Sequence, residues 1–193
     1  NLIFAVYNAK AYDELNLETY FLKESTGFVG QYFVVRTDDI FKSSKCNDES
    51  ANDIRYTKMI FMAQDKYPVS GKWFYHEDEA MRKKNVTILP VIRGTEMQYI
   101  MAEYYARKGN WTEAANSLNE IRRARGCWDD ISFDKWEDFV KELIIDARRE
   151  WISEGQLFYL YKRLNADVDF GKGVKRPFKR QEAVVPMPAS QSM

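Results

Sequence analysis

The sequence has little of several features that mark particular protein classes. It contains two cysteines, Cys46 and Cys127, a single histidine, His76, and no excess of either charge, because 29 lysines and arginines balance 29 aspartates and glutamates. The cysteines have no Cys-x-x-Cys spacing and no histidine cluster near them, so we expect no metal site. A chain with no net charge also lacks the basic excess of a general nucleic-acid binder, so no nucleic-acid partner is expected.

Two cysteines are too few to indicate a disulfide framework. We expect Cys46 and Cys127 to be free, partly buried side chains, with a single disulfide between them as the alternative. No apolar run approaches the ~20 residues of a membrane-spanning helix, and no signal peptide is visible. The sequence begins inside a predicted strand, residues 1–7, which indicates that the natural chain extends further upstream.

Motifs of common enzyme classes are also missing. There is no nucleophile elbow (GxSxG), no P-loop and no GxGxxG, so no nucleotide cofactor is expected. Catalysis by a Ser-His-Asp or Cys-His arrangement would have to use His76, which we place in a surface loop. We therefore predict that the protein is not an enzyme. A glycosidase would need two carboxylates at a defined separation, and the many acidic residues make a chance pair uninformative.

Aromatic residues are what the sequence has in quantity: 5 Trp, 12 Tyr and 12 Phe. Most should belong to the core. Trp73, Tyr75 and Trp128 fall in predicted loops or hairpin ends, and we interpret them as candidate sugar-stacking residues, because aromatic faces suit the apolar patches of pyranose rings. The alternative is that each anchors the core or an interface.

The first part of the chain, residues 1–92, has an irregular pattern with short strands. Strands are predicted over 2–7 and 31–36, and a hairpin is predicted with strands over 59–63 and 72–75. The turn of this hairpin would contain Pro68 and Gly71. Residues 42–53 are polar and predict a loop, and residues 12–24 could hold a short helix.

From residue 93 the apolar pattern changes to a helical period, which makes the predicted fold mostly α. Thr95 is the expected N-cap of a first helix that ends at Gly109, and a second helix should run from Thr112 to Gly126. A third should begin at Asp134 with a capping box and continue, with a kink, past Gly155. We expect one domain over 1–193, with the helical core at 93–164 and an extended tail at 165–193.

The first helix carries two stripes of different character. Met97, Ile100, Met101 and Tyr104 recur at three- and four-residue spacing and form an apolar stripe. Ala102, Ala106 and Gly109 form a stripe of small residues that would let another helix approach closely.

Residues 104–115 resemble the middle of a tetratricopeptide unit, in which Gly109 permits the turn and Ala114 lets two helices touch. Only one such unit is visible, so the hairpin must dock on something else. The predicted fold is therefore a tetratricopeptide-like hairpin and a long helix, accompanied by irregular loops and short strands.

A longer set of segments resembles the SusD/RagB family. These segments are 92–103, 118–126, 147–155 and 185–188, with 52–55 resembling an Asp-x-Arg element that lies upstream in the family. Their order agrees with the family, and together they are more specific than any one alone. The sequence departs from the pattern at Ala147, where the family has Glu, and after Gly155, where it has an Arg and an Asp-Leu pair.

The resemblance implies a surface-exposed lipoprotein of the outer membrane, of the Bacteroidetes type used in polysaccharide utilisation. Such proteins capture oligosaccharides or other nutrients, pass them to a TonB-dependent transporter resembling SusC, and do no chemistry. Membrane attachment would come only from a lipidated N-terminus that this chain does not contain. Two alternatives remain: a helical-repeat scaffold for protein partners, and a carbohydrate-active enzyme.

The helical part also carries charged residues on faces that should be packed. We expect these to form ion pairs between helices, as architecture and not as catalytic groups. They are Arg93, Glu96, Glu103, Arg122, Arg125, Arg148, Glu150 and Glu154. Gly109, Ala114 and Gly155 are expected to have structural roles.

Overall fold

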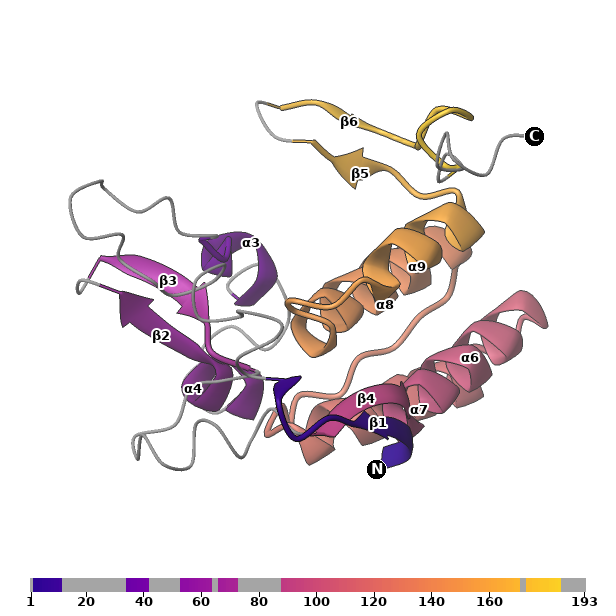
Figure 1. Cartoon of the computed structure of the whole chain (residues 1–193). Helices are drawn as coiled ribbons and strands as arrows, with labels where there is room; N and C mark the ends of the chain where they lie inside the picture. The colour runs from indigo at the N-terminus through magenta and orange to yellow at the C-terminus, as the bar shows by residue number, and fades with distance from the viewer. Residues whose placement is uncertain are drawn as a thin grey trace. The chain divides into compact units, whose positions relative to one another are not determined.

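The computed structural model describes residues 2–11, 34–41, 53–63, 66–72, 88–170 and 173–184. Trp73, Tyr75, His76 and Cys46 lie outside these ranges, as do the predicted helix at 12–24 and most of the predicted strand at 31–36. The chain divides into two compact units, Asn1–Ser153 and Glu154–Met193. Helices predominate over a few short antiparallel strand pairs (Figure 1), which confirms the mostly α prediction.

The first unit contains a helical hairpin. Helix α6 spans Gly94–Arg107, and α7 spans Trp111–Ala124. The two helices meet through small side chains, since Ala102, Ala106 and Ala114 are all buried. Gly109 has φ +73°, a left-handed conformation that suits glycine, and the Asn110 side chain caps α7 by accepting from the backbone N–H of Glu113. The predicted positions of the two helices are therefore correct, although Thr95 lies within α6 and is not its N-cap.

Helix α8, Trp136–Glu150, differs from its prediction at both ends. It begins after Lys135, which makes no side-chain capping bond, so Asp134 lies outside the first turn and the predicted capping box is absent. It ends at Glu150, where the chain enters a turn with Ser153 at φ 61°. That left-handed residue interrupts the helical hydrogen bonds, and a separate helix begins at Gln156 instead of a continuous, kinked one.

The strands of the first unit pair in two antiparallel ribbons. Strand β1, Leu2–Tyr7, confirms the strand predicted over 2–7, and it pairs with β4, Ile88–Arg93, which was not predicted. Strand β2, Ile60–Ala63, pairs with β3, Tyr67–Ser70. A hairpin is present here, as predicted. Its second strand is β3, however, which lies in the segment predicted as the turn, and the second strand had been predicted at 72–75. The other edge of β3 carries an isolated bridge between Val34 and Val69 and no full strand among the described residues, and a proline such as Pro68, which has no N–H to donate, is tolerated at such an edge.

Two short helices accompany these ribbons, α3 at Thr37–Phe41 and α4 at Ile54–Met59. Phe41, Ile40 and Ile152 form a small buried cluster against which Tyr56 and Ile60 pack. This cluster joins the irregular N-terminal part of the unit to the end of α8.

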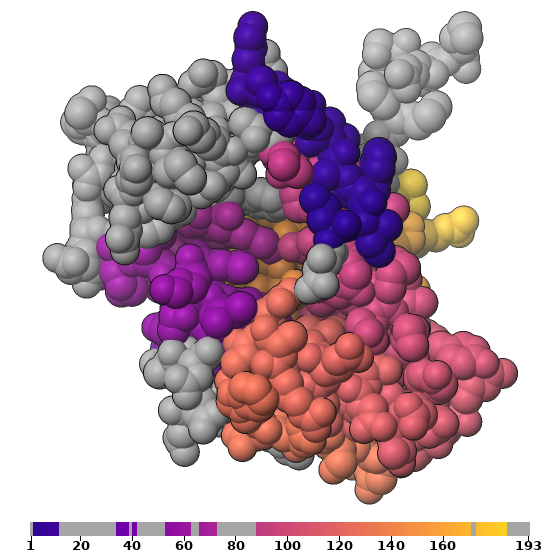
Figure 2. Space-filling model, turned by 90° about the horizontal axis from the view of Figure 1, so that it is seen from below, coloured from indigo at the N-terminus to yellow at the C-terminus, as the bar shows by residue number. Residues whose placement is uncertain are grey.

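Large apolar side chains are exposed on β1 and on one face of α6. Leu2, Ile3, Phe4, Val6 and Tyr7 are all exposed, and β1 lies at the surface in Figure 2. The apolar stripe of α6 is open as well, with exposed fractions between 38% and 57%. It consists of Met97, Ile100, Met101 and Tyr104. Helix α6 therefore packs on α7 through its small residues and leaves the larger ones uncovered.

The second unit contains α9, Gln156–Leu164, and a two-stranded ribbon of β5, Val168–Asp169, and β6, Lys175–Arg176. Phe178 contacts both Phe158 and Phe170, with ring centroids 5.2 and 6.0 Å away. Arg176 covers the Phe170 ring and pairs with Glu182. These contacts form a small, partly exposed aromatic cluster within the unit.

Candidate functional site

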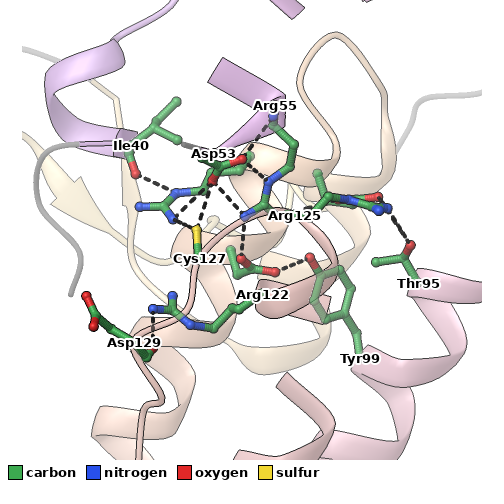
Figure 3. A network of polar contacts seen from close by, with 12 residues as sticks. Ile40, Asp53, Arg55, Thr95, Tyr99, Arg122, Arg125, Cys127 and Asp129 are labelled. Carbon is green, nitrogen blue, oxygen red and sulfur yellow. Dashed lines mark hydrogen bonds and ion pairs between the residues drawn. The ribbon is translucent and has the colours of Figure 1, made fainter. Parts of the chain in front are cut away.

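A cluster of buried charged side chains lies where α4, α6, α7 and α8 meet (Figure 3). The members come from four separate parts of the chain. They are Asp53 and Arg55 beside and in α4, Thr95 and Tyr99 in α6, Arg125 at the end of α7, and Asp146, Arg149 and Glu150 in α8. We refer to them as the ion cluster.

Arg55 is at the centre of the ion cluster, and its side chain is 0% exposed. Its Nε and Nη2 atoms donate to the two carboxylate oxygens of Asp53 at 3.0 and 2.9 Å. Nη2 also donates to Asp146 Oδ1 at 2.9 Å, and Nη1 lies 3.5 Å from Glu150 Oε2. Asp53 is the N-cap of α4 and also accepts from the Arg55 backbone N–H, so the local turn helps to position this pair.

The Glu150 carboxylate also binds a second guanidinium, that of Arg125. The Nε and Nη2 atoms of Arg125 donate to Oε2 and Oε1 at 3.0 and 2.8 Å, the paired geometry that makes arginine–carboxylate contacts strong. The Thr95 hydroxyl donates to Oε1 at 3.2 Å. The predicted ion pairing between helices is present for Arg125 and Glu150.

The ion cluster is completed by Tyr99 and Arg149. The Tyr99 hydroxyl donates to Asp146 Oδ2 at 2.6 Å. Arg149 lies 3.5 Å from Asp53 Oδ2, and its Nε donates to the Ile40 carbonyl at 2.9 Å. Three carboxylates thus face three arginines, so the ion cluster carries no net charge.

The surroundings shift the pKa of several members. Burial is the largest single influence on Asp146 and would raise its pKa, but the charge and hydrogen bond of Arg55, the hydrogen bond from Tyr99 and the Arg149 charge together hold the pKa below its usual value. Burial is also the largest influence on Glu150 and would raise its pKa, but the hydrogen bond from Arg125 and the charges of Arg55 and Arg125 together lower it. Burial raises the pKa of the Tyr99 hydroxyl, which stays a neutral donor. Burial and the nearby Arg55 charge lower the pKa of Arg149 to about 10, so it is still a cation at neutral pH.

The chemistry of the ion cluster is structural. Each carboxylate already accepts from at least one arginine or hydroxyl, so none is left as a free general base. A pocket of about 170 Å³ lies beside it, lined by Gly94, Thr95, Gln98, Glu120, Ile121, Ala124 and Arg125. That volume is below the few hundred Å³ typical of ligand sites. The ion cluster therefore holds elements together and does not present a reaction centre.

The other predicted structural residues take different positions. Glu103 pairs with Arg107 of its own helix at 2.8 Å. Arg122 is buried and donates to the Asp129 carbonyl at 3.1 Å, while its Nε has no hydrogen-bond partner among the described atoms. The remaining charged residues are only partly buried. They are Arg93, Glu96, Arg148 and Glu154. Gly155 precedes α9 as its N-cap.

The predicted ion pairs included only Arg125 and Glu150 of the ion cluster. The other members were missed, among them Asp146, Arg149 and Tyr99. The family-like motif directs attention to Arg148, but Arg149 is the buried arginine. A usable signal was present: Asp146, Arg149 and Glu150 recur at three- and four-residue spacing alongside buried Leu143 and Ala147. Charges on an otherwise buried helix face indicate partners inside the protein.

Cys127 is disulfide-bonded, so the expectation of free cysteines is wrong for this residue. Its side chain is fully buried, and its Sγ lies 3.4 Å from Asp53 Oδ2 and 3.9 Å from Arg149 Nη1. A disulfide sulfur has no proton to donate, so the contact with Asp53 is a packing contact. The bond therefore ends directly against the ion cluster.

Trp128 follows Cys127 and is exposed to 69%, which agrees with its predicted place in a loop. Residues Cys127–Ile131, which we call the Trp128 loop, connect α7 to α8 and are held by α7. Asn119 donates to the Ile131 carbonyl and accepts from its N–H, both at 2.9 Å. Arg123 pairs with Asp130 through two bonds.

These contacts fix the backbone on which Trp128 stands. Asn119 and Arg122 satisfy loop backbone groups from a regular helix, which is a rigid support for a binding side chain. The large exposed indole therefore has a fixed location, and this combination suits stacking against an apolar ligand face. Of the three predicted stacking residues, Trp128 is the one that the described residues include.

Wider comparisons do not identify the protein. Comparison with models of protein families, with characterised proteins and with solved structures gives no significant match. Among the residues described, no helix is long and apolar enough to cross a membrane. Within the same ranges, no group of three or more His, Cys, Asp or Glu side chains could hold a metal ion.

Proposed function

We propose that this chain is part of a non-enzymatic, surface-exposed nutrient-binding protein of the SusD/RagB type. It would capture oligosaccharides and deliver them to a SusC-like TonB-dependent transporter in the outer membrane. The observation that carries the binding role is Trp128, a large aromatic exposed to 69% on a loop held by Asn119, Arg122 and Arg123.

Two further observations support the proposal. Segments that resemble the family, 52–55, 118–126 and 147–155, supply Arg55, Arg125 and Glu150 to one buried cluster. Because these residues contact one another in the folded chain, there is a physical reason for a motif that consists of widely spaced segments. The disulfide of Cys127 favours an oxidising compartment such as the periplasm or the cell surface.

The binding role is tested by screening this chain on a glycan array and titrating any bound glycan by calorimetry. Trp128→Ala should weaken binding about tenfold, because the loss of about 1.4 kcal/mol of aromatic contact corresponds to that factor. Tyr104→Ala is the matched control, since Tyr104 is an exposed aromatic on α6 and should leave affinity unchanged.

Two other results would contradict parts of this proposal. A glycan whose affinity does not change in Trp128→Ala would remove that residue from the site. Release of shortened product during the titration, abolished by replacing a single carboxylate, would establish the carbohydrate-active enzyme instead.

A second candidate function is a scaffold for protein partners. We infer a tetratricopeptide-like arrangement for α6 and α7, and the exposed α6 stripe gives this candidate a specific basis, because repeat units bury such faces against a neighbour. Specific binding of a purified protein partner, lost in Ile100→Asp and kept in Trp128→Ala, would favour the scaffold over glycan capture.

A further inference from the structure

Cys127 and Trp128 are neighbours in sequence and lie in opposite environments. The Cys127 side chain is 0% exposed, against the ion cluster, while the adjacent indole is mostly in solvent. The position of Trp128 therefore depends on how firmly the chain is held at the residue just before it.

The Trp128 loop is held unevenly on its two sides. The side-chain bonds from α7 reach Asp129, Asp130 and Ile131, all of which follow Trp128. On the preceding side, the Cys127 N–H donates to the Arg122 carbonyl at 2.9 Å. Arg125 is held further back by Glu150, and the buried side chain of Cys127 is the anchor nearest to Trp128 on this side.

That anchor rests on a fixed surface. Cys127 Sγ contacts Asp53, whose carboxylate is bound by Arg55, and Arg149, whose guanidinium is bound to Asp53 and to the Ile40 carbonyl. In addition, the N–H of Ile54 donates to the Arg125 carbonyl at 2.9 Å, which joins the start of α4 to the end of α7.

We propose that the disulfide of Cys127 is a positioning element for Trp128, joining Cys127 to Cys46 and holding the Trp128 loop in its binding conformation. Cys46 is the only other cysteine of the chain. This inference rests on the proposed binding role for its effect on affinity, but not for its effect on the loop itself.

The first experiment is peptide mapping without reduction, which should recover one cross-linked peptide pair containing Cys46 and Cys127. Failure to find that pair would overturn the proposal. The second uses Cys46→Ser, which removes the covalent bond and leaves the Cys127 side chain in place. The chain is labelled with fluorotryptophan, and the five resonances are assigned by single Trp→Phe substitutions.

In Cys46→Ser the Trp128 resonance should shift or broaden, while that of Trp151, which is buried against Tyr99, stays unchanged. Glycan affinity should fall about tenfold if the freed loop spends about a tenth of its time in the binding conformation. An unchanged Trp128 resonance would overturn the positioning role. If the Trp151 resonance moves to its unfolded position, the comparison is repeated in sucrose, which restores compact states.

The two proposals fail in different ways. A changed Trp128 resonance in a chain that binds no glycan supports the positioning role and counts against glycan capture. A bound glycan with equal affinity for both forms overturns the positioning role and leaves glycan capture standing.

Discussion

At the scale of single residues, Arg55 is a charged side chain that is buried completely and depends on its partners for neutralisation. It is fully buried, and it neutralises Asp53 and Asp146 directly. Arg55→Met would keep much of the side-chain volume but leave two buried carboxylates without this partner. Such a change should lower the free energy of unfolding by about 3 to 5 kcal/mol, measured by urea denaturation.

Arg107→Met is the control for this substitution. Arg107 also pairs with a carboxylate, that of Glu103, but its side chain is 51% exposed. Solvent screens such a pair, so the loss should be below about 1 kcal/mol. Equal losses for the two variants would contradict the view that burial makes the ion cluster important.

The depressed pKa values of Asp146 and Glu150 predict how stability depends on pH. Their arginine partners favour the charged carboxylates in the folded state, so the unfolded chain binds protons more readily. The stabilisation is present above the unfolded pKa values, near 4, and is lost as pH falls through the lower folded values. Urea midpoints should therefore drop between about pH 7 and about pH 3, and drop less in Asp146→Asn.

At the scale of elements, the turn between α6 and α7 depends on the backbone conformation of Gly109. No atom lies within 4 Å of a Cβ built at this residue, so the cost of a side chain comes from φ +73° alone. Gly109→Val should lower the free energy of unfolding by about 1 kcal/mol or more. Gly155→Ala is the control, because that glycine has φ −80° and equally open space. Similar thermal stability of both variants would remove this account of the turn.

Regular elements with local signals were predictable from the sequence. The positions of α6 and α7 follow from apolar periodicity and from Gly109. Strand β4 was missed because Pro90 interrupts its pattern, and its pairing with β1 is a contact between segments about 80 residues apart that periodicity cannot reveal. The end of α8 was missed because the apolar pattern continues through Ser153, where the backbone turns left-handed.

The candidate site was less predictable than the helices. The exposure of Trp128 follows from its neighbours Gly126 and Asp129, which indicate a loop. By contrast, the ion cluster and the Cys127 disulfide are sets of tertiary partners, and residue type alone does not say that Arg149 is buried while Arg148 is only partly so. Spacing identifies the face of a helix, but the partner across that face comes from the fold.

At the scale of the whole chain, the disulfide should make a large contribution to stability. A bond between Cys46 and Cys127 would close a loop of about 80 residues, and the reduced chain entropy of the unfolded state corresponds to about 4.5 kcal/mol. Cys46→Ser should therefore unfold at lower urea concentration than the parent. The Ser44→Ala variant, a change two residues away that leaves both cysteines, should unfold at the same concentration as the parent. An unchanged midpoint in Cys46→Ser would contradict a structural bond.

The ion cluster also has a consequence for the order in which the chain folds. Its bonds join residues 91, 95 and 109 positions apart, from Arg55 to Asp146 and Glu150 and from Ile40 to Arg149. Contacts of such long range form slowly, because the entropy of closing the loop is lost before the contact forms. The helical hairpin, whose contacts are local, should form early, and the charged side chains should remain hydrated until α4 docks in a late step.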